Sequence, residues 1–241
     1  MKQTNQLIGN YGQCHIGDCL DYMHTLSDQQ FDLGFTDPPW GHKYNGKTPM
    51  GINAQVYKEE IINYDDQFNP IWNHLWFTEL TRVCKRVVIA MGWRHFNWWV
   101  ANTDPRGYFF LTFKNGQGST KVCKHNAVHP FLCYGDAFRD RKKKFHWNFL
   151  DTYIPNGFLR GTYKFIHPSP KPFQDWYKMI SELHPDSLFD PFAGTCTIGE
   201  VGEALRIPWE GVELNKDYSK DIQYRIRCGM TYKQTTQQKL M

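Results

Sequence analysis

The sequence has no apolar run long enough to cross a bilayer. Its longest run extends only from Val87 to Met91, whereas a membrane-spanning helix needs about 20 apolar residues. The first residues, MKQTNQLIGN, contain no apolar segment of the kind found in a secretory signal peptide. These absences predict a protein without a membrane partner, located in the cytoplasm of a prokaryote or of a phage-infected cell.

Paired cysteines are also lacking. The number of cysteines is odd, at seven, and no two are spaced as Cys-x-x-Cys, the spacing typical of zinc sites and redox motifs. We therefore predict free thiols and no disulfide framework. His125 and His129 are four residues apart, but the residues VHPFLCY have the pattern of a strand and no third ligand is evident. No metal site is predicted.

Two common nucleotide-binding patterns, G-x-G-x-x-G and G-x-x-x-x-G-K-[ST], are absent as well, which argues against dinucleotide and ATP binding. The 241 residues suffice for one α/β domain or two small ones. A content of 41% hydrophobic and 22% charged residues is that of a globular protein and excludes a disordered chain.

Short apolar runs alternate with helical patterns along the chain. The runs at 13–16, 31–36, 86–92, 108–113, 127–134, 187–190 and 209–214 are typical of buried strands. Helical patterns occupy 18–26, 70–83, 95–101, 172–184, the residues up to 205, and 215–227. This alternation predicts a mostly parallel sheet with helices on both faces.

The tetrapeptide Asp37-Pro38-Pro39-Trp40 follows a predicted buried strand. Two prolines remove two N–H donors, so the backbone here offers carbonyls without competing donors. Together with the carboxylate of Asp37 they make a site that only accepts hydrogen bonds. Such a site suits the exocyclic amine of a nucleobase, whose lone pair is delocalised into the ring. Trp40 supplies a face on which an extruded base can stack.

A second motif, Asp190-Pro-Phe-Ala-Gly-Thr195, lies between a predicted strand and a predicted helix. Glycine there allows the backbone to approach a ligand closely, and the following helix N-terminus favours an anionic group. Glu213 ends the next predicted strand, where an acidic residue accepts hydrogen bonds from ribose hydroxyls in nucleoside-binding sheets. The two features together predict a nucleoside cofactor.

These motifs resemble those of the β-class of amino methyltransferases, which use S-adenosylmethionine (SAM) to methylate adenine N6 or cytosine N4 in DNA. The resemblance covers Cys14 to Trp40 and His167 to Tyr218, with the catalytic motif before the cofactor motif, as in that family. It implies a Rossmann-like methyltransferase fold with a mostly parallel seven-stranded sheet, SAM as the cofactor and DNA as a partner. The family's members are often dimers, which implies a homodimer here and leaves a cognate restriction nuclease open as a partner.

Residue by residue, the resemblance implies that Asp37 and the carbonyl of Pro38, followed by Pro39, hold the target amine while Trp40 stacks on the base. The residues that it places around the cofactor are Asp18, Asp37, Lys171, Asp190, Phe192, Gly194, Thr195, Cys196 and Glu213, with Glu213 at the ribose. Cys196 stands where the family commonly has a second glycine. Because cysteine disfavours positive φ, we expect a reshaped loop or altered cofactor affinity.

The segment from Lys114 to His146 contains eight Lys and Arg residues against two Asp, a local net charge of +6 in a chain of net charge +4. Such a segment is as consistent with a solvated surface loop as with a nucleic-acid contact, but the methyltransferase motifs favour contact with nucleic acid. Candidate contact residues are Lys121, Lys124, Arg139, Arg141, Lys142, Lys143 and Lys144. We expect a single methyltransferase domain over 1–241, with a small target-recognition insertion at about 114–164.

We therefore predict a site-specific DNA methyltransferase that transfers a methyl group from SAM to adenine N6 on a flipped base by direct in-line displacement. Three alternatives stay open. They are an N4-cytosine DNA methyltransferase, an N6-adenine RNA methyltransferase, and a non-catalytic nucleic-acid-binding subunit.

Overall fold

The short apolar runs of the chain form the strands of one central sheet. The computed structural model describes residues 6–39, 43–44, 64–65, 68–92, 95–113, 128–139, 149–152, 163–167 and 169–233. Within these residues the strands are β1 (Gln6–Ile8), β2 (Gly12–Ile16), β3 (Phe31–Thr36), β4 (Lys43–Tyr44), β5 (Tyr64–Asp65), β6 (Cys84–Ala90), β7 (Gly107–Phe113), β8 (Val128–Tyr134), β9 (Phe149–Thr152), β10 (Leu188–Asp190) and β11 (Trp209–Glu213). The α-helices are α1 (Cys19–Met23), α2 (Pro70–Val83), α3 (Phe96–Thr103), α4 (Phe173–Glu182), α5 (Thr197–Leu205) and α6 (Ser219–Met230). Single turns of 3₁₀ helix cover Asp136–Arg139 and Lys216–Tyr218.

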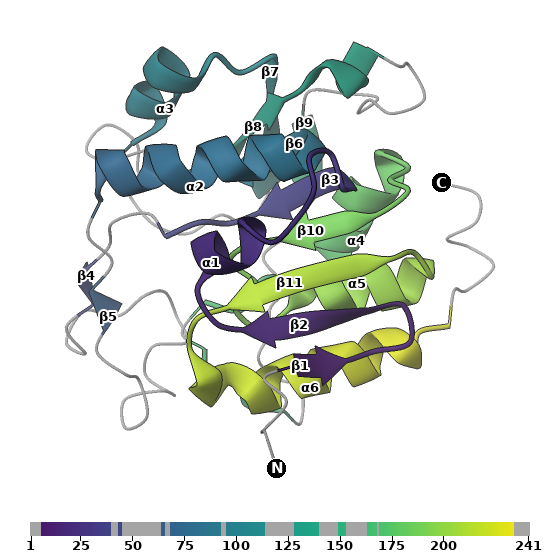
Figure 1. Ribbon diagram of the computed structural model, residues 1–241. Helices are drawn as coiled ribbons and strands as arrows, with labels where there is room; N and C mark the ends of the chain where they lie inside the picture. The colour runs from purple at the N-terminus through teal and green to yellow at the C-terminus, as the bar shows by residue number, and fades with distance from the viewer. Residues whose placement is uncertain are drawn as a thin grey trace.

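Nine of these strands form a sheet in the order β1-β2-β11-β10-β3-β6-β8-β7-β9 (Figure 1). The strands from β2 to β6 in this order are parallel to one another, and β8 is antiparallel to both β6 and β7. In the centre, Leu188 of β10 lies between Leu33 of β3 and Trp209 of β11. Strands β4 and β5 form a separate two-stranded antiparallel pair.

Each face of the sheet is covered by three helices and has its own apolar core. One core contains the inward-facing residues of α4, α5 and α6, among them Trp176, Ile198 and Ile226. The other contains those of α1, α2 and α3, among them Met23 and Trp76. In Figure 1, α1 and α2 lie in front of the sheet, and α4 and α5 lie behind it. This is the doubly covered α/β architecture that the alternating pattern predicts.

Local capping explains where two helices begin on the front face. Asn69 accepts hydrogen bonds from the backbone N–H groups of Ile71 (3.0 Å) and Trp72 (3.1 Å), directly before the proline that opens α2. Asp18 caps α1 in the same way, by accepting from the N–H groups of Leu20 and Asp21. A side-chain acceptor at the N-cap satisfies donors that the helix itself leaves unpaired. The sequence pattern thus fixes the N-termini of both helices.

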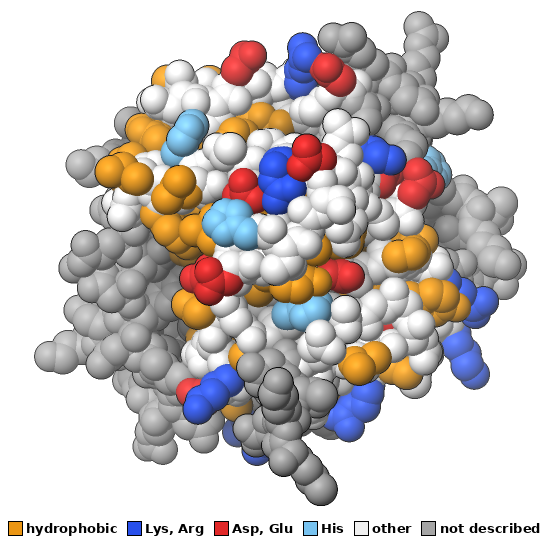
Figure 2. All heavy atoms as spheres, in the orientation of Figure 1, with side chains coloured by type: hydrophobic (Ala, Val, Ile, Leu, Met, Phe, Trp, Pro, Cys, Tyr) orange, Lys and Arg blue, Asp and Glu red, His pale blue; other side chains and the backbone are white. Residues whose placement is uncertain are grey.

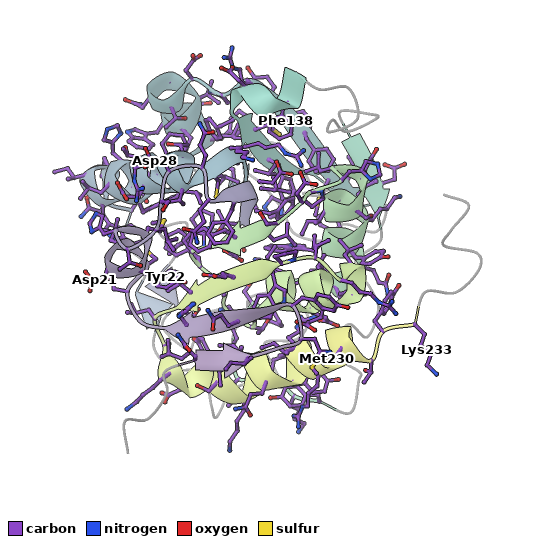
Figure 3. All side chains as sticks on the ribbon, turned by 45° about the vertical axis from the view of Figure 1, so that its right-hand side comes forward. Asp21, Tyr22, Asp28, Phe138, Met230 and Lys233 are labelled. Atoms are coloured by element: carbon purple, nitrogen blue, oxygen red, sulfur yellow. The ribbon has the colours of Figure 1, made fainter. Side chains whose placement is uncertain are left out.

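Polar contacts fasten α1 to the elements beside it. The hydroxyl of Tyr22, which Figure 3 shows on α1 beside β11, donates to Glu210 on that strand. Arg82 of α2 donates to the carbonyls of Met23 (2.7 Å) and Leu26 (2.9 Å) and pairs with Asp28. The segment that follows β2 is therefore held between the sheet and α2.

The outer surface of α2 is not uniformly polar. Figure 2 shows apolar side chains there, where Ile71 is 75% and Leu75 is 51% exposed. The opposite side of the helix buries Trp76, Leu80 and Val83. Burial of this inner side, rather than polarity of the outer one, therefore positions the helix.

The fold class is the one that the sequence predicts, but two details differ. All seven predicted strands are present, whereas the described residues form a sheet of nine, because β1 and β9 add one strand to each edge. Helix α1 is shorter than the predicted 18–26 and begins after its cap, Asp18. Most of the expected insertion at 114–164 lies outside the described residues. No helix in the described ranges is long and apolar enough to span a membrane.

Candidate active site

Three carboxylates come together at one edge of the sheet. Asp37 directly follows β3, Asp190 is the last residue of β10, and Glu213 is the last residue of β11. The three strands are adjacent and parallel, so their carboxyl ends meet at the same edge, which is where open α/β sheets bind their ligands. The two sequence motifs are thereby brought together, although about 150 residues separate them in the chain.

A cavity of about 560 Å³ opens at this edge. Its walls contain residues of both motifs, and the volume lies in the range of pockets for small molecules and cofactors. The lining residues predicted from the sequence are Asp18, Asp37, Pro38, Pro39, Lys171, Asp190, Phe192, Gly194, Thr195 and Glu213. Cys196 is fully buried behind the cavity wall and does not line it.

The glycine-containing loop is tied to the end of the neighbouring strand. The N–H group of Gly194 donates to Glu213 Oε2 (2.8 Å), and the N–H group of Asn215 donates to Oε1 (2.8 Å). Gly194 has φ +54°, and a Cβ atom on it would lie 3.1 Å from His167 Nε2. A side chain here would therefore be strained by the backbone and crowded by the imidazole, so glycine is required.

Cys196 adopts a left-handed backbone conformation, which glycine tolerates better than other residues. Its φ and ψ are 65° and 47°, in the left-handed region, and its N–H group donates to the carbonyl of Ala193 (2.6 Å). A Cβ on Gly199 would lie 2.7 Å from Cys196 Sγ, so the absence of a side chain at Gly199 makes room for the thiol. Whether the loop differs in shape from that of the family, or binds the cofactor with altered affinity, stays a prediction.

Burial raises the pKa of two of the three carboxyls. Asp190 is 1% exposed, accepts hydrogen bonds from Thr36 Oγ1 (2.6 Å) and the N–H group of Phe192 (3.0 Å), and has its pKa raised by burial to about 7. Burial likewise raises the pKa of Glu213 to about 7, against the opposing effect of its backbone hydrogen bonds. A cationic ligand in this cavity would favour the ionised form of both groups.

Asp37 lies opposite a lysine from another part of the chain. Lys171 Nζ forms an ion pair with Asp37 Oδ2 and also donates to Ser169 Oγ (3.1 Å). The Asp37 side chain is 13% exposed and the Lys171 side chain 24%. The sequence predicts both residues at the site but not their contact.

Among the cavity residues that were not predicted as site residues, His167 and Trp72 have the clearest contacts. The Nδ1 atom of His167 accepts a hydrogen bond from the N–H group of Ser169 (3.0 Å), and burial lowers the pKa of the ring to about 3. The neutral ring therefore carries its proton on Nε2, beside Gly194. Trp72 packs on Phe192 with ring centroids 5.6 Å apart and lines the cavity too. The helical spacing of Trp72 in the sequence indicates a core residue and does not indicate a place in the site.

A nucleoside ligand fits this set of donors and acceptors. Glu213 can accept from vicinal hydroxyls, and the Nε2–H group of His167 is a donor for which no described residue supplies an acceptor. Thr195 is 2% exposed and lines the cavity, and among the described residues its Oγ1 atom has no hydrogen-bond partner. A buried polar atom without a partner lowers the stability of the folded state unless a ligand or water forms a hydrogen bond with it.

The remaining predicted residues lie outside the described part of the chain. These are Trp40, Lys121, Lys124, Arg141, Lys142, Lys143 and Lys144. Arg139 ends a 3₁₀ turn, but its side chain is also outside the description. The stacking role of Trp40 and the nucleic-acid contacts of the basic segment therefore stay predictions.

No family model matches the chain. Among curated proteins it is similar to the type II methyltransferase M.HinfI of Haemophilus influenzae, with 24% identity over 88% of this chain and 67% of that protein. It is similar also to the type II methyltransferase M.HpaI of Haemophilus parainfluenzae, with 25% identity over 87% of this chain and 72% of that protein.

Solved structures share the fold at lower identity. The cytosine-N4-specific PvuII DNA methyltransferase superposes with a TM-score of 0.61 and 16% identity, covering 96% of this chain and 90% of its own. The complex of M1.HpyAVI with SAM gives a TM-score of 0.59 at 17% identity, covering 89% of this chain and 98% of its own. The nine-stranded arrangement is thus a variant of a known architecture.

Proposed function

We propose that this chain, a distant homologue of the type II DNA methyltransferases over most of its length, transfers a methyl group from SAM to an exocyclic amine of a DNA base. One observation carries the proposal. Asp37, Pro38 and Pro39 line the same cavity as Gly194 and Glu213. The site for an amine and the site for a nucleoside are therefore contiguous, which a transfer between the two requires.

The acceptor side of the site suits an aromatic amine. Asp37 offers a carboxylate, and Pro38 and Pro39 contribute no N–H donors. An acceptor on each of its two hydrogens draws the amine towards tetrahedral geometry, which frees the lone pair from the ring. Asp37 acts as an orienting acceptor in this scheme, and the surplus proton leaves the nitrogen after the new N–C bond has formed.

The donor side suits SAM, which supplies an electrophilic methyl group on a sulfonium when bound. Glu213 accepts from the ribose hydroxyls, and Asp18, Phe192 and Gly194 form the surrounding wall. Thr195 and His167 offer hydrogen-bonding groups to its polar substituents. The cationic sulfonium is compatible with a cavity that has four carboxylates in its lining.

We propose adenine N6 as the target, because the Asp-Pro-Pro-Trp motif favours adenine over cytosine. Cytosine N4 is the second candidate, and the shared fold with the cytosine-N4-specific PvuII enzyme favours it. Both amines present the same chemical problem to Asp37 and Pro38. For the basic segment we propose contact with the DNA backbone.

Mass spectrometry of nucleosides tests the proposal directly. Unmethylated DNA and RNA are incubated with the protein and SAM, digested and analysed, and we expect N6-methyladenine in DNA. N4-methylcytosine alone would refute the adenine assignment, and methylation of RNA alone would refute DNA as the substrate. If no base is methylated and calorimetry detects no binding of SAM, the chain is a non-catalytic subunit.

Asp37→Ala tests the acceptor site. We expect methyl transfer to fall by more than about a hundredfold, because the amine loses an oriented acceptor. The affinity for SAM, measured by calorimetry, should stay within a few-fold of the wild type. Asp28→Ala is the control, since Asp28 is exposed and does not line the cavity. Retained transfer in Asp37→Ala would contradict the assigned role.

A further inference from the structure

The ion pair of Lys171 and Asp37 joins two segments that the sequence assigns to different tasks. Asp37 belongs to the amine-binding motif, whereas the resemblance places Lys171 beside the cofactor. In the structure Lys171 Nζ contacts Asp37 Oδ2. Lys171 is also the only Lys or Arg among the described residues that line the cavity. The acidic residues Asp18, Asp190 and Glu213 line the same cavity.

The backbone of Lys171 is fixed by helices on the back of the sheet. Arg225 Nη2 of α6 donates to the carbonyl of Lys171 (2.7 Å), and Thr197 at the start of α5 donates to the same atom (3.4 Å). Arg225 is itself held by Glu200 of α5, with 2.6 Å between Nη1 and Oε2. The ammonium therefore extends towards Asp37 from a buried anchor.

We propose that Lys171 is the positioning residue for Asp37, whose carboxylate its ammonium holds ionised and oriented for the target amine. This inference deepens the proposed function and rests on it for its catalytic meaning. The ion pair occupies one carboxylate oxygen of Asp37, Oδ2. This contact restricts the rotation of the Asp37 carboxylate.

The surroundings make a positive partner necessary. Asp37 faces Asp190 on β10, and the two charges repel, which contributes to the raised pKa of Asp190. Glu213 lies farther along the same cavity. Burial, with a smaller contribution from the charge of Lys171, lowers the pKa of His167 and of His129 on β8 to about 3, so both rings are neutral. Lys171 is therefore the group that compensates the charge of Asp37 among these neighbours.

Carbon-13 NMR of the protein labelled at the side-chain carboxyl of aspartate tests the inference without turnover. The Asp37 signal is identified by its loss in Asp37→Asn. In Lys171→Met we expect its titration midpoint to rise by about one to three pH units, the range for an opposite charge in contact. Lys171→Arg keeps the charge and should restore a midpoint close to that of the wild type.

Lys178→Met is the matched control, because Lys178 is an exposed residue of α4 that does not line the cavity. Circular dichroism and thermal unfolding verify that each variant is folded. An unchanged Asp37 midpoint in Lys171→Met, or an equal shift in Lys178→Met, overturns the inference.

A second measurement connects the ion pair to catalysis. In Lys171→Met, kcat for methyl transfer should fall most at acid pH and recover as the pH rises. Equal loss at every pH would overturn the positioning role. If the wild type methylates no base but the NMR midpoint shifts as expected, the proposed function fails and the electrostatic role of Lys171 stands.

Discussion

At the residue scale, Cys196 shows how a substitution in a glycine loop is accommodated. The residue keeps φ at 65°, a conformation that costs a non-glycine residue about 1–2 kcal/mol. Its side chain is fully buried near the thiol of Cys14 on β2, and the interaction with Cys196, together with burial, raises the pKa of the Cys14 thiol. Packing of the thiol against β2 and Gly199 therefore offsets the backbone strain.

Two substitutions at this position separate strain from packing. Cys196→Gly and Cys196→Ala both remove the thiol, but only alanine keeps the strain of the left-handed backbone. We expect the glycine variant to be the more stable by about 1 kcal/mol, the reverse of the order in an ordinary helix or strand. Thermal unfolding measures the difference, and a more stable alanine variant would show that the backbone leaves this conformation.

The sequence identifies residues at the site better than it identifies their partners. Asp37, Gly194 and Glu213 follow buried strands and belong to recognisable motifs, so their place at one sheet edge is predictable. The contact of Lys171 with Asp37 depends on an anchor at Arg225, which no local pattern reveals. His167 also escapes prediction, because its role follows from the hydrogen bond that fixes its tautomer.

At the scale of elements, α5 approaches the sheet closely through its glycines. A Cβ on Gly199 would lie 2.8 Å from Trp209 Cη2, and a Cβ on Gly202 would lie 2.4 Å from Trp209 Cδ1. The indole nitrogen donates to Glu203 of the same helix (2.8 Å). Trp209 thus fits into a slot on α5, and this fit sets the position of the helix N-terminus behind the cavity.

Gly202→Ala changes the stability of the protein through two effects of opposite sign. Helix propensity favours alanine by about 1 kcal/mol, whereas forcing a Cβ against the base of the indole costs about 1–3 kcal/mol. We expect packing to dominate and Tm to fall, by about 2–4 °C for each kcal/mol lost. Gly107→Ala is the control, since a Cβ there meets nothing within 4 Å. An increase in Tm for Gly202→Ala would mean that α5 moves away from Trp209 without cost.

Elements with clear boundaries are predictable, and those at the sheet edges are not. The strand of β3 is fully buried and stopped by two prolines, and α2 begins at an Asn-Pro cap. Strand β1, in contrast, has only three residues, with one half-buried between two exposed. It is a strand because it pairs with β2, which is a tertiary effect without a periodic signal.

At the scale of the whole molecule, parallel strands collect negative charge at one end of the sheet. Asp37, Asp190 and Glu213 come from three adjacent strands, and burial raises the pKa of Asp190 and of Glu213 to about 7. A carboxyl whose pKa is raised in the folded state contributes stability at low pH, which is lost as the pH rises through about 7. Ionisation of both carboxyls therefore lowers the stability of the folded protein when the cavity holds no ligand.

The same two groups predict how cofactor affinity depends on pH. Ionised carboxylates attract a sulfonium cation and accept hydrogen bonds from ribose, so we expect the affinity for SAM to increase several-fold from pH 6 to pH 8 and to level off above that. Calorimetry measures the trend. Glu213→Gln should bind more weakly at pH 8 and with a shallower dependence on pH. An affinity independent of pH in the wild type would contradict the raised pKa values.

The position of β10 also affects how the protein is made. This strand separates β3 from β11 in the middle of the sheet, yet it begins only at Leu188. While the ribosome is still synthesising the first 187 residues, the nascent chain has β3 with one side unpaired, a state prone to wrong association. The central sheet can therefore close only after β10 and β11 have been synthesised.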